Sequence, residues 1–224
     1  MNWLLLSAAL TLGASTGAER DAFENGTLIF LENCNSVVEY STRADIGHVA
    51  MVFRSDAGEG AAVWIYEATP GEVRRVLLNE YYAELARINK RRDSDDQVRV
   101  WALRPKKPYS DDEVSRMREY LDEQVGRRYS IKNYVRKKPG DGIHCAELAS
   151  NTLNRSGRFV FEQCHRIHPS ALFAAMKSTH HSPVEVQIPT LTAKESWCVR
   201  ANRRWSEWSN WCGWSCKEAW LMLW

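Results

Sequence analysis

The chain has 224 residues, of which 44% are apolar and 26% are charged. This composition is ordinary for a soluble globular protein, and the length suffices for one domain with a sizeable core. The formal net charge is only +2, so the chain lacks the strong positive field that attracts nucleic acid, and we expect no nucleic-acid partner.

The N-terminus has the pattern of an export signal. Residues 1–18 carry no charged side chain, contain a short apolar run at 4–12, and are followed by the polar residues 19–21. Small residues at 16–18 suit a signal peptidase, and the run is too short for a stable membrane span. We expect a signal peptide over 1–18 and an exported protein, periplasmic, in the cell envelope or secreted. An uncleaved N-terminal membrane anchor is the alternative.

Short apolar runs rich in β-branched and aromatic residues predict strands. These strands are expected at 26–31, 48–53, 62–67, 73–78 and 98–103. The turn-like residues 55–60 join the second and third strands into a hairpin. Residues 34–44 are ambiguous, with a short helix as one interpretation.

The second half of the chain favours helices. Residues 81–89 have helical character, and 110–125 form an amphipathic pattern that Ser110 and Glu113 can open as a capping box. A glycine-containing loop at 139–142 then leads into an apolar-periodic helix over 144–153. Strands followed mainly by helices predict an α+β fold, in which a small antiparallel sheet packs against helices.

Cys145 is placed at the first turn of the last of these helices, directly after the loop. The N–H groups and partial positive charge of a helix N-terminus favour a thiolate and can stabilise an oxyanion. The alternative for a single cysteine is a buried structural residue.

The predicted hairpin brings two further groups together. His48 opens its first strand and Glu67 closes its second, so both are expected at the same end. A histidine there can take and return the thiol proton, and a carboxylate can fix its tautomer. A surface histidine and a strand-end charge are the alternatives, and five other histidines are present.

The order of these segments resembles a known family. The chain is similar to the circularly permuted branch of the NlpC/P60 papain-like superfamily, close to the YiiX/YaeF-type amidases. The resemblance rests on Gly26–Phe30, on Gly47-His48-Val49-Ala50, on Ile65-Tyr66-Glu67-Ala68, on Gly126-Arg127-Arg128-Tyr129, on Cys145-Ala146-Glu147-Leu148 and on His168-Pro169-Ser170-Ala171-Leu172. The departures are Thr27 for the usual Asp, Gly47 for the usual Ser, and His144 where an aromatic residue often precedes the cysteine.

The resemblance implies a permuted papain-like domain over 19–190 with Cys145, His48 and Glu67 as catalytic residues. It implies a thioester acyl-enzyme that water or another acceptor resolves. His144 is a candidate substrate-binding residue, although a simple helix-entry role is also open. Peptides, amides and lipid esters are the expected substrate classes.

We expect neither a metal nor a cofactor. Cys164, His165, His168, His180 and His181 match no strong zinc spacing, and no nucleotide-binding glycine motif is present. The six cysteines do not fix a disulfide pattern, since a catalytic Cys145 leaves five.

The residues 191–224 form a tail rich in tryptophan and cysteine. A peripheral contact with a membrane interface and coverage of an apolar patch on the domain are both open for it. For the whole protein, a cysteine hydrolase is the first hypothesis. A lipid or acyl transferase on the same fold and a catalytically silent binding module at a membrane surface are the alternatives.

Overall fold

The computed structural model describes residues 23–34, 45–55 and 62–188. In this part of the chain, six strands form one antiparallel sheet in the order β4-β3-β2-β1-β5-β6. The strands are β1 (Leu28–Glu32), β2 (Ile46–Arg54), β3 (Val63–Ala68), β4 (Val73–Leu77), β5 (Arg99–Leu103) and β6 (Val184–Val186). The helices are α3 (Leu78–Asn89), α4 (Asp111–Gln124), α5 (Lys132–Arg136), α6 (Cys145–Arg155) and α7 (Pro169–Met176), with short 3-10 turns η1 (Ser94–Asp96) and η2 (Cys164–Arg166).

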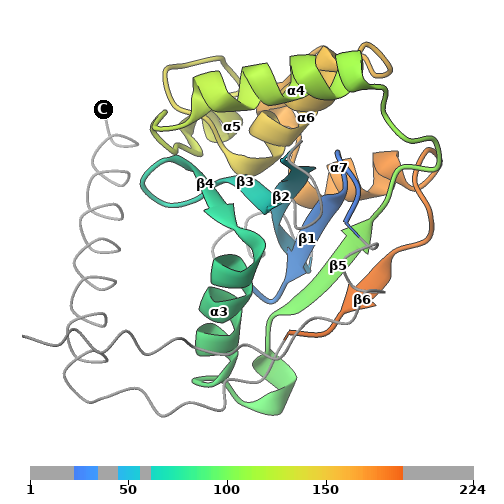
Figure 1. Ribbon diagram of the computed structural model, residues 1–224. Helices are drawn as coiled ribbons and strands as arrows, with labels where there is room; N and C mark the ends of the chain where they lie inside the picture. Colours follow the sequence, from blue (N-terminus) through green and yellow to red (C-terminus); the bar gives the residue numbers. More distant parts are fainter. Residues whose placement is uncertain (1–22, 35–44, 56–61, 189–224) are drawn as a thin grey trace, which may run out of the picture.

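The sheet is covered on both faces, which explains why its central strands are apolar almost throughout. Successive side chains of a strand point to opposite faces. One set, including Phe30, Met51 and Tyr66, packs with α4, α6 and α7, while the alternate set packs with α3. Figure 1 shows α4 and α6 together on one side of the sheet and α3 on the other. The expected α+β class, with an antiparallel sheet against helices, is confirmed.

The predicted hairpin is present as β2 and β3. Its register runs from Arg54 opposite Val63 to Met51 opposite Tyr66. The N–H of Ser55 donates to the carbonyl of Ala62 at 2.9 Å where the strands approach their connection. The start of β2 and the end of β3 therefore lie at the same end of the sheet, as the hairpin requires.

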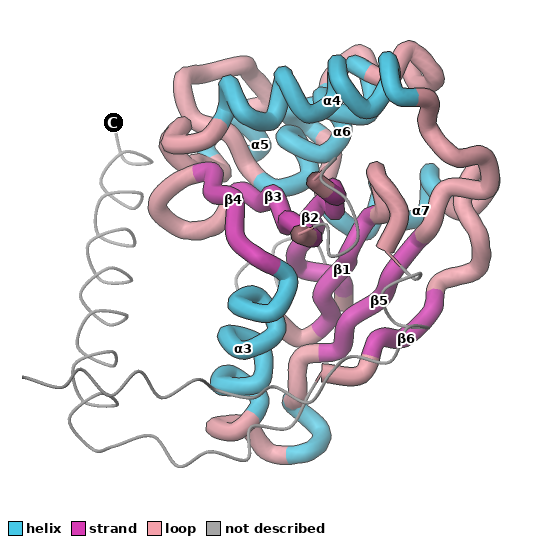
Figure 2. Tube along the Cα trace, viewed as in Figure 1, coloured by secondary structure: helices cyan, strands magenta, loops and turns pink. Residues whose placement is uncertain are grey.

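The helix predictions also hold, with small shifts of boundary. Ser110 caps α4: its hydroxyl accepts from the Glu113 N–H at 3.4 Å, and the Glu113 carboxylate accepts from the Ser110 N–H at 2.7 Å. The predicted capping box is confirmed. The helix expected at 81–89 begins earlier, because α3 follows β4 without a loop and starts at Leu78. Figure 2 shows this direct strand-to-helix passage.

Three short elements, α5, α7 and β6, were not predicted. Each spans eight residues or fewer, so periodicity provides little signal. Pro169 does occupy the first turn of α7, and the His168 ring caps that helix.

Several expectations concern residues outside the described ranges. The signal peptide at 1–18, the tail at 191–224, and the short helix at 34–44 beyond Cys34 belong to this group. Among the described residues, no helix has the length and apolar character needed to cross a membrane.

Candidate active site

Cys145 lies in the first turn of α6, as predicted; it is the first residue of that helix and is almost completely buried. The loop before it passes very close to its neighbours. A Cβ on Gly142 would lie 2.4 Å from the Cβ of Ser130, so only glycine fits without a local shift. The Asn133 side-chain amide fixes the same loop by donating to the Gly142 carbonyl at 2.8 Å and to the Glu147 carboxylate at 3.3 Å. Asn133 belongs to α5, so this unpredicted helix positions the start of α6.

His144 caps α6 rather than lying open to solvent. Its Nδ1 accepts from the Glu147 N–H at 3.3 Å, and its Nε2 lies 3.2 Å from the carbonyl of His165. Burial lowers the pKa of His144, while Cys145 and Glu147 raise it more strongly. His144 is thus a helix-entry residue beside Cys145, and its contact with substrate stays a prediction.

His48 and Glu67 meet at the end of the sheet where β2 begins and β3 ends. The Nε2 atom of His48 lies 2.7 Å from Oε2 of Glu67, and their side chains are 14% and 4% exposed. A carboxylate in this position holds the proton on Nε2 when the ring is neutral. The opposite ring nitrogen, Nδ1, is then the one that can exchange a proton with Cys145.

The three groups perturb one another strongly. Burial raises the pKa of the Cys145 thiol, but the charge of His48 and hydrogen bonds with His144 and His48 outweigh it and lower the pKa to about 6. Burial lowers the pKa of His48, but the charge of Cys145 and hydrogen bonds with Cys145 and Glu67 raise it to about 10. The mutual effect favours a thiolate beside an imidazolium.

Glu67 has a second partner that the sequence motifs did not indicate. Nε of Arg74 donates to Oε1 of Glu67 at 2.8 Å, and its Nη2 lies 2.6 Å from the same oxygen. The two residues are directly opposite each other on β3 and β4. The available signal was their symmetric placement, with opposite charges, around the turn at Pro70 and Gly71.

The residues considered for a metal site lie in different local settings. Cys164 is buried, the His165 carbonyl faces the ring of His144, His168 caps α7, and His180 is buried. Within the described ranges, no group of three or more His, Cys, Asp or Glu side chains is arranged to hold a metal ion.

The architecture is similar to that of metalloprotein YiiX from Escherichia coli O157:H7. The crystal structure of that protein matches 76% of this chain and 99% of its own, with a TM-score of 0.51 and 13% sequence identity. At this identity the likeness concerns the fold alone, and it confirms the YiiX-type permuted papain-like fold that the motifs indicated. No protein-family model matches the chain, and no curated protein matches its sequence.

Proposed function

We propose that the protein is a cysteine hydrolase acting on amide or peptide bonds, with Cys145 as nucleophile, His48 as acid and base, and Glu67 as the group that orients His48. The observation that carries this proposal is the buried pair with opposed shifts: the pKa of Cys145 falls to about 6 while that of His48 rises to about 10. Strongly perturbed pKa values of this kind are concentrated at functional sites. Burial alone would raise the pKa of a thiol, so a lowered pKa indicates specific partners.

Cys164 illustrates that difference within the same chain. It is also a buried thiol, and burial raises its pKa above the ordinary value. Cys145 differs because two imidazoles lie against it at the start of a helix. The contrast supports an activated thiolate at Cys145 and an inert thiol at Cys164.

Acylation follows from this arrangement. The Cys145 thiolate attacks the carbonyl carbon, and the electron pair of the C=O bond moves to oxygen. The N–H groups of Glu147 and Leu148 donate to the side chain and the carbonyl of His144. The N–H groups before them, at the very start of α6, are the ones that can donate to the oxyanion. When the tetrahedral intermediate collapses, the C–N bond breaks and His48 gives its proton to the departing amine. A thioester on Cys145 remains.

Deacylation uses the same residues in reverse. Neutral His48 takes a proton from water as the water oxygen attacks the thioester carbonyl. Collapse of the second tetrahedral intermediate breaks the C–S bond and releases a carboxylic acid and the thiolate. Glu67 keeps the ring of His48 oriented in both halves of the cycle. The same acyl-enzyme gives a transferase where an amine or alcohol replaces water as the acceptor.

The test is a comparison of purified wild type with Cys145→Ser, His48→Ala and, as a matched control, Cys164→Ser. A panel of short acyl amides, peptides and acyl esters is incubated with each variant, and the covalent adduct is located by mass spectrometry. Turnover and an acyl adduct on Cys145 are expected in wild type and Cys164→Ser, with both lost in Cys145→Ser. Turnover that survives Cys145→Ser contradicts the proposal, and the same ligands bound without turnover by every variant favour a binding module.

A further inference from the structure

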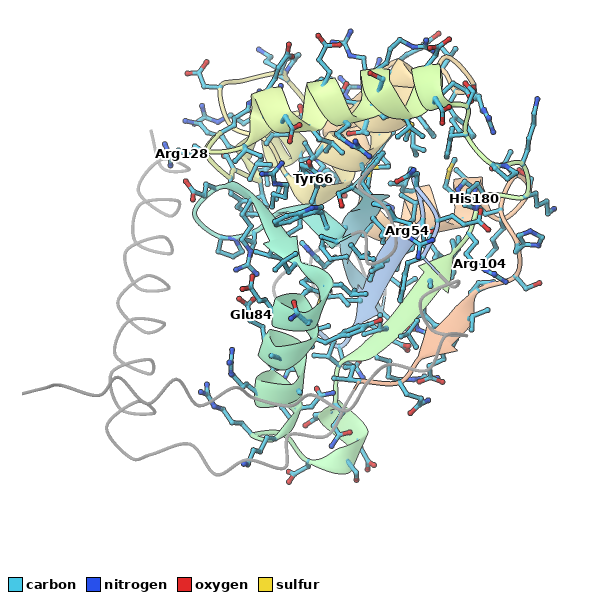
Figure 3. The ribbon with its side chains drawn as sticks, in the orientation of Figure 1. Arg54, Tyr66, Glu84, Arg104, Arg128 and His180 are labelled. Carbon is cyan, nitrogen blue, oxygen red and sulfur yellow. The ribbon has the colours of Figure 1, made fainter. Side chains whose placement is uncertain are left out.

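Arg74 bridges two carboxylates that belong to different layers of the fold. On one side it contacts Glu67 through Nε and Nη2, as described above. On the other side, its Nη1 and Nη2 donate to the two carboxylate oxygens of Glu84 at 3.2 and 2.6 Å. Glu84 lies on α3, where Figure 3 labels it on the side of the sheet that α3 covers. A continuous chain of contacts thus runs from His48 through Glu67 and Arg74 to Glu84.

The side chains in this row of contacts become more exposed with distance from Cys145. The side chain of Glu67 is 4% exposed, that of Arg74 is 31% exposed and that of Glu84 is 39% exposed. Burial on its own raises the pKa of Glu67, yet the hydrogen bonds and charges of His48 and then Arg74 hold it below its ordinary value. A buried carboxylate needs such partners to remain charged.

We propose that Arg74 is a positioning residue for the candidate triad. It holds the Glu67 carboxylate charged and directs Oε2 toward His48, and Glu84 in turn fixes the guanidinium. This inference rests on the proposed function, because it assigns a role in supporting His48 and Cys145. Arginine suits the task because its planar, permanently charged fork reaches two carboxylates at once, whereas lysine offers a single point charge.

The surroundings of Glu67 leave Arg74 as its main cationic support apart from His48. Among the described residues, His48 from β2 and Arg74 from β4 lower the pKa of Glu67, while Tyr81 nearby on α3 is acted on by Glu67, Cys34, Arg74 and Glu84. Burial and the negative charge of Glu67 raise the pKa of Tyr81 well above its ordinary value, so its phenol stays neutral. Removal of the Arg74 charge should therefore make the charged form of Glu67 less stable. The imidazolium of His48 then loses part of its support, and the pKa of Cys145 rises.

The neighbouring arginine provides a matched control. Arg75 is the next residue on β4 and points to the other face, where its Nη1 lies 3.3 Å from Asp122 on α4. It also lies over the ring of Trp64. Arg75→Met removes one arginine of the same strand and one ion pair without touching Glu67.

The experiment measures the pH dependence of Cys145 alkylation by iodoacetamide in the full-length protein, with the adduct located by mass spectrometry. We expect Arg74→Met to raise the midpoint by about one pH unit, as the loss of a nearby opposite charge does. Arg74→Lys should restore part of the shift, and Arg75→Met should leave the midpoint unchanged. Because a purely structural residue changes the melting temperature without moving this midpoint, the pH profile is the decisive readout.

The possible results separate this inference from the proposed function. If His48→Ala moves the midpoint while Arg74→Met leaves it in place, the positioning role is refuted and the catalytic pair stands. If wild type and His48→Ala have the same midpoint, the proposed function itself fails. Should Arg74→Met not fold, Arg74→Gln keeps a hydrogen-bond donor without the charge, and an unchanged midpoint in that variant also overturns the proposal.

Discussion

Replacement of His48 by alanine tests the centre of the proposed site. The pKa of the Cys145 thiol lies at about 6 instead of 9.0, which corresponds to about 4 kcal/mol in favour of the thiolate at ~1.4 kcal/mol per pH unit. His48 is the largest favourable contributor to that shift, and burial opposes it. Without the imidazole, we expect the pKa to rise by roughly two to three pH units, because desolvation of the thiolate is no longer offset by the His48 charge.

The assay is the rate of alkylation at Cys145 measured across pH. At pH 7, a thiol with a pKa of about 6 is roughly 90% thiolate, whereas one with a pKa of about 9 is roughly 1% thiolate. Absolute rates change less than this ratio, because a thiolate of lower pKa is also a weaker nucleophile. The midpoint of the rate–pH curve avoids this complication and reports the pKa itself.

A wild-type midpoint near pH 9, or an unchanged midpoint in His48→Ala, would refute the proposed effect of His48 on Cys145. Cys164→Ser should reproduce the wild-type curve, since Cys164 is not among the groups that shift the pKa of Cys145 and its own pKa is raised. The alkylation midpoint of Glu67→Gln is expected to lie between those of wild type and His48→Ala. In this variant His48 remains but loses the charge that supports its imidazolium.

Three further predictions concern the scaffold. Ser110→Ala should lower the free energy of unfolding by about 1 kcal/mol in urea titrations through loss of the α4 cap, with the alkylation midpoint unchanged. Gly142→Ala should cost about 1–3 kcal/mol and slow alkylation of Cys145, because the added Cβ meets Ser130 and displaces the loop before α6; wild-type stability and rate would contradict this. Burial lowers the pKa of His180 to about 4, below its unfolded value, so its contribution to stability is present above pH 6.5 and lost as pH falls toward 4. Between pH 6.5 and 4 the free energy of unfolding should therefore fall by up to about 3 kcal/mol less in His180→Gln than in wild type. Urea titrations at both pH values measure this fall, and an equal fall in the two proteins would refute the prediction.

The sequence was most informative where a pattern was local. The capping box of Ser110 and Glu113 lies within four residues, and the β2–β3 hairpin follows from two apolar runs around one turn. The hairpin already places His48 and Glu67 at one end of the sheet. The order of the motifs extended this to the fold, because joint order and spacing carry information that no single segment holds.

The sequence was least informative where tertiary contacts decide the structure. The five residues of α5 have no periodic signal, yet Asn133 on that helix ties the loop at Gly142 to Glu147. Arg74 reads as one of two consecutive arginines in a strand, and only the register of β3 and β4 shows which of them faces Glu67. The role of His144 as a helix cap also depended on the ring orientation, which residue order does not specify.

The contacts at the site explain how charge can be held in a protein interior. The charges of four neighbouring groups sum to zero when Cys145 is a thiolate, His48 an imidazolium, Glu67 a carboxylate and Arg74 a guanidinium. Each of these groups interacts with the next in that order. Loss of one of these four groups leaves its neighbour as an uncompensated buried charge, which lowers the free energy of unfolding by more than an intact ion pair adds to it. On the proposed function, the pKa of Cys145 is expected to depend on the whole row rather than on His48 alone. Because Arg74 reaches the partly exposed Glu84 at its outer end, the proposal predicts that an ion pair near the surface of α3 influences the reactivity of the buried Cys145 thiol.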